Sequence, residues 1–289
     1  MYKYSMTQWI VGDEDIEQSF RRLKNCGYDG IEFAAEPYTL DAERLLALME
    51  KYGLSCTSLC GIFPEERDLT ASEPEAAEAA VKYVCDSVDL AVRVGAPLMI
   101  VVPSPVGRVA PPAGRSIEDI RACAVRNIRR AADYAHSRGV ILAIEAINRY
   151  ETYFANTLEK ALSLVEEIDH PAVKLMADLF HMSLEERDIP RSLRMIAKHL
   201  VHVHIADNTR EAAGLGSTDF RAALRTLIGY CGSLTMEFMP RLANPYESGA
   251  LSTQSELMDV YAKQSIDYMR CVEASLTCAA PERNCQEHE

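Results

Sequence analysis

The chain has 289 residues, of which 48% are hydrophobic and 25% charged, an ordinary mixture for a globular protein. Its 43 acidic residues outnumber 30 basic ones, giving a formal charge of −13 without any run of Lys or Arg. That balance argues against nucleic acid or an anionic membrane as a partner. No uncharged stretch reaches the ~18 residues of a spanning helix. The N-terminus lacks the apolar segment of a signal peptide, so we expect a cytoplasmic protein.

The nine cysteines do not form a disulfide pattern, since their number is odd and none belongs to a CxxC pair. Seven of them fall in apolar helix or strand patterns: Cys26, Cys56, Cys60, Cys85, Cys123, Cys231 and Cys271. We expect these seven to be reduced and buried thiols. The other two, Cys278 and Cys285, lie in a polar segment.

Short β-rich runs alternate with amphipathic segments up to about residue 274. We expect strands at residues 3–9, 30–33, 55–60, 98–102, 141–145, 173–178, 200–206 and 233–238. Between them, apolar residues recur at helical spacing, as in Ala77, Val81, Val84, Val88 and Ala91. Alternating strands and helices predict a parallel sheet with helices outside it.

Local signals mark where the helices end and begin. A glycine precedes four of the expected strands, where a helix should stop: Gly27, Gly53, Gly95 and Gly139. A capping residue with an acid three positions later is expected to open three helices: Ser72, Ser116 and Asn156. The proline-rich residues 103–114 are expected to form a long loop after the fourth strand.

Eight strand–helix units fit a closed (β/α)8 TIM barrel of the α/β class better than an open doubly wound sheet. No GxGxxG follows the first strand and no GxxxxGK[ST] occurs, so dinucleotide and P-loop sites have no support. We expect a single barrel domain over residues 1–274. Residues 275–289 are polar and are expected to form a flexible tail.

Polar side chains end four consecutive predicted strands, and in such a barrel the strand ends carry the chemistry. Glu145, Asp178, His204 and Glu237 end strands five to eight. A single such acid would be a capping or loop residue, and a single such histidine a core residue. Four at matched depth favour a shared site for a hard divalent cation such as Mn²⁺, Co²⁺ or Mg²⁺. His202 lies one layer deeper, so we expect it to pack inside the barrel or behind a ligand.

Three further polar residues follow these strand ends at short spacing: Glu151, His181 and Arg210. We expect them in the loops above the cation. A polar ring around a metal suits a polyhydroxylated ligand, because each hydroxyl needs a donor or an acceptor. The sequence therefore predicts a small sugar-like substrate.

Four segments carry a resemblance to a known family. Residues 142–151 (LAIEAINRYE), 174–186 (KLMADLFHMSLEE), 202–210 (HVHIADNTR) and 235–238 (TMEF) resemble the ketose 3-epimerases of the D-tagatose/D-allulose type. That family belongs to the xylose-isomerase-like superfamily of sugar isomerases and epimerases. The motifs DxFHMxxEE and ExxNRxE are typical of its epimerase branch, and the likeness is strongest over residues 140–240.

The resemblance implies a role for each site residue. Glu145, Asp178, His204 and Glu237 match the family's metal ligands, and Glu145 and Glu237 also match its two acid/base carboxylates. Those two residues would invert a carbon next to a ketose carbonyl, C3, through an enediolate. By the same resemblance, Glu151, His181 and Arg210 hold the substrate, the cation is Mn²⁺ before Co²⁺ or Mg²⁺, and the enzyme forms a homodimer or homotetramer.

Two departures leave the substrate open. The family's PGxGRxPW loop is replaced by EAAGLGSTDF at residues 211–220, and the N-terminal strand reads YSMTQW instead of an aromatic run. The sugar can therefore be free, phosphorylated or conjugated. Alternatives within the superfamily are an aldose–ketose isomerase and an inosose dehydratase. Two alternatives of another class are a non-catalytic sugar-binding barrel and a subunit of a C-glycoside-cleaving complex. Endonuclease IV shares the fold but needs more histidines and a basic groove.

Overall fold

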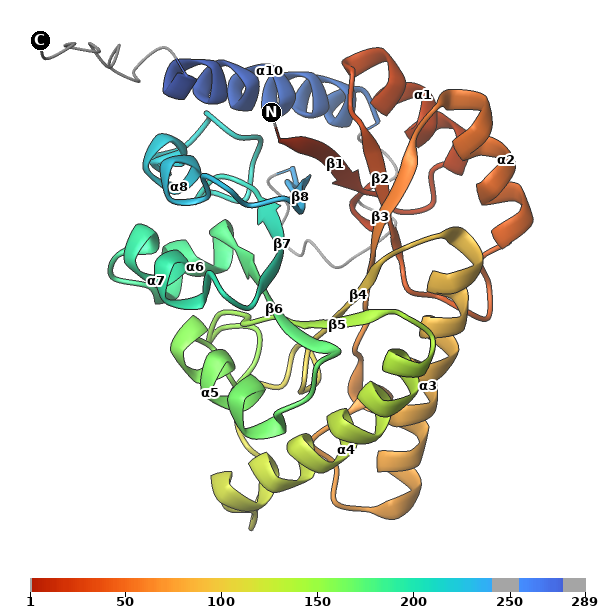
Figure 1. Cartoon of the computed structure of the whole chain (residues 1–289), viewed down its shortest axis with the longest axis vertical. Helices are drawn as coiled ribbons and strands as arrows, with labels where there is room; N and C mark the ends of the chain where they lie inside the picture. The colour runs from red at the N-terminus through yellow and green to blue at the C-terminus, as the bar shows by residue number, and fades with distance from the viewer. Residues whose placement is uncertain (1, 241–254, 278–289) are drawn as a thin grey trace, which may run out of the picture.

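The chain folds as a closed barrel of eight parallel strands with helices on its outside (Figure 1). The computed structural model describes residues 2–240 and 255–277. The first strand pairs in parallel with both the second and the eighth, which closes the barrel without leaving an edge. The predicted (β/α)8 TIM barrel is confirmed.

The elements follow one another in chain order around the barrel. The strands are β1 (Lys3–Thr7), β2 (Gly30–Ala34), β3 (Ser55–Cys60), β4 (Leu98–Val101), β5 (Ile141–Ile144), β6 (Val173–Asp178), β7 (Leu200–Ile205) and β8 (Ser233–Met236). The helices are α1 (Ile16–Cys26), α2 (Ala42–Tyr52), α3 (Pro74–Val94), α4 (Ile117–Ser137), α5 (Leu158–Ile168), α6 (Leu179–Glu185), α7 (Ile189–Ile196), α8 (Phe220–Thr226) and α10 (Ser255–Thr277). Short 3-10 turns cover Trp9–Val11 and Glu65–Arg67.

Several strands end one or two residues before the predicted position. Glu145 and Glu237 follow β5 and β8 directly, yet their backbone N–H groups still donate to neighbouring strands, at 3.0 Å to Val101 and 2.9 Å to Ile205. Both carboxylates therefore keep the level of the strand ends. Trp9 lies in a 3-10 turn instead of β1, and that turn closes at Gly12 with a φ of 61°.

The predicted helix stops are all confirmed. Gly27, Gly53, Gly95 and Gly139 have positive φ angles of 63° to 81°, which a side chain would strain. These residues let the chain leave each helix and enter the next strand within two or three positions. The loop predicted over residues 103–114 is also present, between β4 and α4.

One of the three predicted helix caps is correct. The Ser116 side chain accepts a hydrogen bond from the backbone of Asp119 and opens α4. Helix α3 instead begins after Glu73, because Pro74 takes the first helical position and needs no hydrogen-bond partner for its nitrogen. Thr157 rather than Asn156 caps α5, since the Asn156 amide donates to two loop carbonyls.

The barrel has two apolar cores separated by the strands. Along β4, Met99 and Val101 pack with the helices, while Leu98 and Ile100 belong to a small cluster with Cys60, Ala143 and Met176. This alternation is the period of two expected of a strand buried on both faces. The small cluster lies inside the barrel, and buried polar side chains, among them Glu32, Ser58 and His202, share that interior with it.

The seven cysteines in the described residues are all free thiols. Cys56, Cys60 and Cys123 are buried and Cys26 and Cys85 are half-buried, but Cys231 and Cys271 are exposed, which corrects the expectation for those two. No described helix is both long and apolar enough to cross a membrane. Helix α10 continues to Thr277, and the remainder of the predicted tail, with Cys278 and Cys285, lies outside the described residues.

Candidate active site

Four side chains predicted to share a site converge at the ends of β5 to β8. Ligand atoms of Glu145, Asp178 and His204 lie within 4.8 Å of one another. Glu237 joins them, with its Oε1 3.3 Å from His204 Nδ1. All four residues are buried, at 6% exposure or less. The four residues that the sequence analysis placed at equivalent strand positions therefore lie together in one cluster.

Two atoms of this cluster have no hydrogen-bond partner among the described residues. Asp178 Oδ1 accepts from the backbone of Phe180 and caps α6, but Asp178 Oδ2 is buried and unpartnered. His204 Nδ1 is also buried and unpartnered. Orphaned buried acceptors are costly unless something satisfies them. Together with the two glutamates they form an oxygen-rich donor set with one imidazole, which fits a hard divalent cation.

The protonation of the cluster shows how strongly its carboxylates repel one another. Burial and the charges of Glu237 and Asp178 raise the pKa of Glu145 well above its usual range, against the opposing charge of His204. Burial and the charge of Glu237 raise the pKa of Asp178 to about 7. Burial also disfavours the Glu237 anion, but the charges of His204 and Arg210 prevail and lower its pKa to about 2. A bound cation would relieve this repulsion.

The predicted substrate residues Glu151 and Arg210 lie beside the cluster. Arg210 Nη1 donates to Glu151 at 3.1 Å, Arg210 Nη2 is 3.6 Å from Glu237, and the guanidinium stacks 4.6 Å from the Phe180 ring centre. Arg210 has a φ of 61°, a conformation that is strained for a residue with a side chain. Such strain is commonly kept where it aims a side chain at a functional site.

His181 is held by Asn148 with one nitrogen toward the cluster. It lies in α6 rather than in a loop, because that helix starts directly after Asp178. Asn148 Oδ1 accepts from the backbone of Tyr150, so its Nδ2 is the donor to His181 Nδ1 at 2.8 Å. Burial and the charge of Arg210 lower the pKa of His181 to about 4. His181 is therefore neutral near pH 7 and carries its proton on Nε2, 3.5 Å from Asp178.

Three residues with contacts to the cluster were missed by the sequence analysis. Trp9 donates its indole N–H to Glu237 at 3.0 Å. Asn148 joins His181 to Glu151, to which its Nδ2 also donates at 2.8 Å. Glu32, on β2, contacts the imidazole of His204 at 3.2 Å. The NR pair of ExxNRxE was a signal for Asn148, whereas an acid inside an apolar strand is the only sequence signal for Glu32.

A cavity of about 630 Å³ adjoins the cluster. Its lining includes five charged or hydrogen-bonding site residues already described: Glu145, Glu151, His181, Arg210 and Glu237. Apolar side chains also line it, among them Ile62, Phe63, Val102, Val106 and Ile147. The cavity thus offers both charged, hydrogen-bonding groups and hydrophobic contact.

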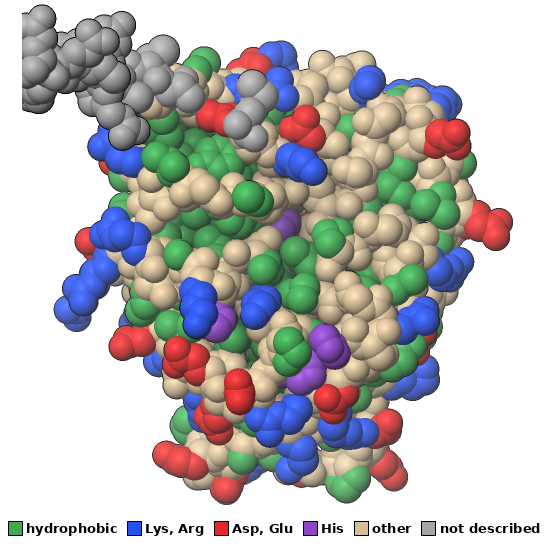
Figure 2. Space-filling model, viewed as in Figure 1, with side chains coloured by type: hydrophobic (Ala, Val, Ile, Leu, Met, Phe, Trp, Pro, Cys, Tyr) green, Lys and Arg blue, Asp and Glu red, His purple; other side chains and the backbone are tan. Residues whose placement is uncertain are grey.

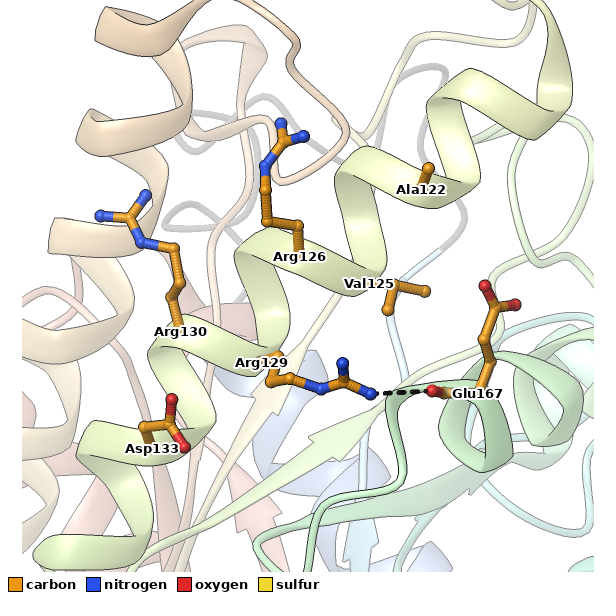
Figure 3. A pocket seen from close by; sticks show the side chains of 7 residues that line it. All are labelled: Ala122, Val125, Arg126, Arg129, Arg130, Asp133 and Glu167. Atoms are coloured by element: carbon orange, nitrogen blue, oxygen red, sulfur yellow. Dashed lines mark hydrogen bonds between the residues drawn. The ribbon is translucent and has the colours of Figure 1, made fainter.

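Two further hollows lie away from these residues. Figure 3 shows Arg126, Arg129 and Arg130 of α4 around a shallow hollow, where Arg129 donates to the backbone of Glu167. Another is lined by residues of α7 and of the segment after α8, on the side of the molecule where hydrophobic side chains gather in Figure 2. Neither contains a buried titratable cluster of the kind found at the strand ends.

Comparisons with known proteins agree with this geometry. The sequence profile of the xylose isomerase-like TIM barrel family matches residues 20–257. A ketose 3-epimerase from Arthrobacter globiformis is 28% identical over 229 residues, 78% of each chain. A 3-dehydro-D-guloside 4-epimerase from Escherichia coli is 30% identical over 249 residues, 81% of this chain and 91% of that protein.

A comparison with solved structures also finds a sugar epimerase. The D-allulose 3-epimerase from a Methylomonas species, in complex with D-allulose, superposes with a TM-score of 0.82 and 25% identity. The match covers 93% of this chain and 96% of that one. The named activities among these relatives are all epimerisations. The chain accordingly belongs to the xylose isomerase-like TIM barrel family and is an enzyme of the isomerase class that resembles the ketose 3-epimerases.

Proposed function

We propose that this enzyme is a metal-dependent epimerase that inverts a carbon next to a ketose carbonyl, C3 in a free ketose. The observation that carries the proposal is the pair Glu145 and Glu237, two buried carboxylates that directly follow strands β5 and β8 and share one donor cluster with Asp178 and His204. A ketose 3-epimerase among the relatives and a D-allulose complex among the similar structures support the choice of reaction.

The residues that would hold the cation are Glu145, Asp178, His204 and Glu237. Mn²⁺ is the first candidate, with Co²⁺ and Mg²⁺ as alternatives, because the donors are three carboxylates and one imidazole. When bound, the cation acts as a Lewis acid and stabilises the negative charge that develops on the substrate's oxygens. Asp178 Oδ2 and His204 Nδ1, which have no hydrogen-bond partner among the described residues, would then gain a partner.

Proton transfer is the task of the two glutamates. A carboxylate removes the proton from the carbon next to the ketone, and the electron pair of the broken C–H bond moves into the enediolate. The other glutamate, which must be protonated at this stage, then donates its proton to the opposite face of the same carbon, which inverts it. In the reverse reaction the two glutamates exchange tasks. Both groups are almost fully buried, so little water would compete for the proton while a sugar fills the cavity, and the groups could exchange with solvent between turnovers.

The groups around the two glutamates would bind the sugar. The neutral His181 offers an N–H donor, and Arg210 offers a fork of donors held between Glu151 and the Phe180 ring. Glu151 accepts from Arg210 and Asn148, so its carboxylate is fixed and remains an acceptor for a substrate hydroxyl. A ligand with adjacent carbonyl and hydroxyl groups satisfies these donors and acceptors together.

Replacing Arg210 by Met is expected to raise KM by about tenfold to a hundredfold, the effect of losing a hydrogen bond to a charged group. Met keeps the apolar stem and adds no backbone strain beyond that of the arginine. Steady-state kinetics measure the change. Arg149→Met is the matched control, because Arg149 pairs with Glu185 with its side chain 61% exposed. An unchanged KM in Arg210→Met would contradict the substrate-binding role.

A second candidate is epimerisation of a keto-glycoside rather than a free ketose. It has the same proton chemistry, and two observations favour it. Part of the cavity lining is apolar, with Phe63, Val106 and Ile147 among the residues. The Escherichia coli relative named for 3-dehydro-D-guloside 4-epimerisation is 30% identical to this chain. Hydrophobic walls give little hydrogen bonding to free hydroxyls but would cover an attached group.

A substrate panel separates the two candidates. The purified enzyme with Mn²⁺ would be incubated with ketohexoses, ketopentoses, inososes and 3-keto-glycosides, and products separated by chromatography. We expect C3 epimers of free ketoses. Epimerised products only from keto-glycosides would favour the second candidate, and aldoses or dehydrated products would contradict epimerisation.

We also propose that the enzyme forms a homodimer or homotetramer and is located in the cytoplasm.

A further inference from the structure

A fully buried polar cluster lies beneath the proposed cation site. Glu32 on β2, Ser58 on β3 and His202 on β7 form it, each at 1% exposure or less. The proton transfers proposed above use none of the three. A carboxylate without exposure is costly unless it is hydrogen-bonded, so the contacts of Glu32 show what it does.

The Glu32 carboxylate is shared by two imidazoles and one hydroxyl. It lies 3.0 Å from His202 Nε2 and 3.2 Å from His204 Nε2, and Ser58 Oγ donates to it at 2.5 Å. An ionised carboxylate only accepts, so both Nε2 atoms carry hydrogen toward it. The hydroxyl and His202 also restrict where Glu32 itself can turn.

This contact decides which nitrogen of His204 faces the cation site. With hydrogen held on Nε2, Nδ1 is the nitrogen that would give up its proton and offer a lone pair to a cation. Nδ1 is the atom that has no hydrogen-bond partner in the described residues and lies 3.3 Å from Glu237. A carboxylate behind a metal-binding imidazole fixes its tautomer and orientation and increases its basicity.

We propose that Glu32 is the positioning residue of the metal centre: it holds His204 through Nε2 so that Nδ1 is ready to bind the cation. The inference rests on the metal centre of the proposed function and adds a residue that acts only through His204. His202 and Ser58 hold the same Glu32 oxygen, Oε2, and bind no cation in this arrangement.

The same atoms allow a competing arrangement that the test must separate. Glu32, His202 and His204 also place one ligand atom each within 4.8 Å of one another. A second cation there would compete with the hydrogen bonds that Glu32 Oε2 accepts from Ser58 and both imidazoles at 2.5 to 3.2 Å, although Oε1 has no hydrogen-bond partner among the described residues. Hydrogen bonding therefore predicts one cation per chain.

The test measures cation binding apart from catalysis. Mn²⁺ affinity and stoichiometry would be measured by calorimetry for the wild type, Glu32→Gln and Ser5→Ala. Ser5 belongs to the same buried polar region but hydrogen-bonds Thr235 and Thr57 instead of an imidazole. We expect one Mn²⁺ per chain, an affinity about tenfold to a hundredfold lower in Glu32→Gln, and no such loss in Ser5→Ala. Co²⁺-loaded protein should show a changed visible absorption spectrum in Glu32→Gln alone.

Each contrary outcome has a separate meaning. Equal Mn²⁺ affinity in the wild type and Glu32→Gln overturns the positioning role while leaving the metal centre intact. Two cations per chain, with one lost in Glu32→Gln, overturns it in favour of a second metal site. No binding by the wild type overturns the metal centre and this inference with it.

A second measurement does not depend on a variant that folds. In Zn²⁺-loaded wild type labelled with ¹⁵N-histidine, NMR reports which nitrogen of His204 carries hydrogen. We expect hydrogen on Nε2 and the cation on Nδ1. The reverse assignment would overturn the proposal, because Glu32 would then face a nitrogen without a proton.

Discussion

Glu145→Gln and Glu237→Gln are each expected to lower kcat by about a hundredfold to ten-thousandfold, the usual contribution of an acid or base in proton transfer. Glutamine has nearly the same shape and still offers an oxygen, but it neither takes nor returns a proton. Both effects should be of similar size, since the reaction needs one group on each face of the inverted carbon. Steady-state kinetics with added Mn²⁺ measure them.

The control for these variants is Glu159→Gln, an exposed position in the first turn of α5. It should behave as the wild type does. A glutamine variant at Glu145 or Glu237 that keeps wild-type kcat would rule out the two-base scheme. The remaining glutamate would then have to serve both faces.

Asp178→Asn is expected to abolish both epimerisation and Mn²⁺ binding at concentrations that saturate the wild type. Asparagine can still cap α6 through its oxygen, because Asn and Asp are equally good caps. The change removes the charge and replaces the unpartnered Oδ2 by an NH₂ group, which cannot bind a cation. Calorimetry measures binding, and Mn²⁺ should raise the unfolding midpoint of the wild type but not that of Asp178→Asn.

Asp188→Asn is the matched control for that substitution. Asp188 caps α7 by accepting from the backbone of Arg191, and it is exposed and outside the cluster. It should keep Mn²⁺ binding, activity and the Mn²⁺-dependent shift in unfolding. Full activity of Asp178→Asn after treatment with a chelator would show that the reaction needs no cation at this cluster.

The fold was predictable because its signals are local. Gly27 and Gly53 end helices because each has a positive φ, which glycine adopts without strain. Along β4, side chains alternate between the two apolar cores because the strand is buried on both faces. Cap positions at Ser72 and Asn156 were wrong by one residue. Glu73, which is followed by Pro74, takes the N-cap position in place of Ser72, and Thr157 takes it in place of Asn156. The sequence alone does not decide between such neighbours, because the choice depends on how the folded chain packs.

The positions of the four cluster residues were also predictable, since consecutive parallel strands bring their ends together. Contacts that depend on distant segments were not. Trp9 reaches Glu237 across 228 positions, and Glu32 reaches His204 across 172. Trp9 was expected in a strand, where its indole would have a different direction. The residues next to Trp9 and Glu32 in the sequence do not indicate which distant side chain each will contact once the barrel closes.

Arg210 illustrates how the fold adds information to a sequence match. Its motif position was read from the sequence, but its left-handed backbone was not. The strain is held by hydrogen bonds on both sides, from the Arg210 N–H to the carbonyl of Asp207 at 2.8 Å and from the Met239 N–H to the Arg210 carbonyl at 2.6 Å. The loop that departs from the family pattern begins at the next residue, so this arginine stays fixed while the loop beyond it differs.

Solvent hydrogen exchange tests proton transfer most directly. The Mn²⁺-loaded enzyme would convert its substrate in D₂O, and NMR of the epimerised product would locate the deuterium. Two glutamates on opposite faces predict one deuterium at the inverted carbon and none elsewhere, because the group that returns the proton has exchanged with solvent. Epimerised product without solvent deuterium would contradict the account, since one group shielded from solvent would then have removed the hydrogen and returned it to the other face.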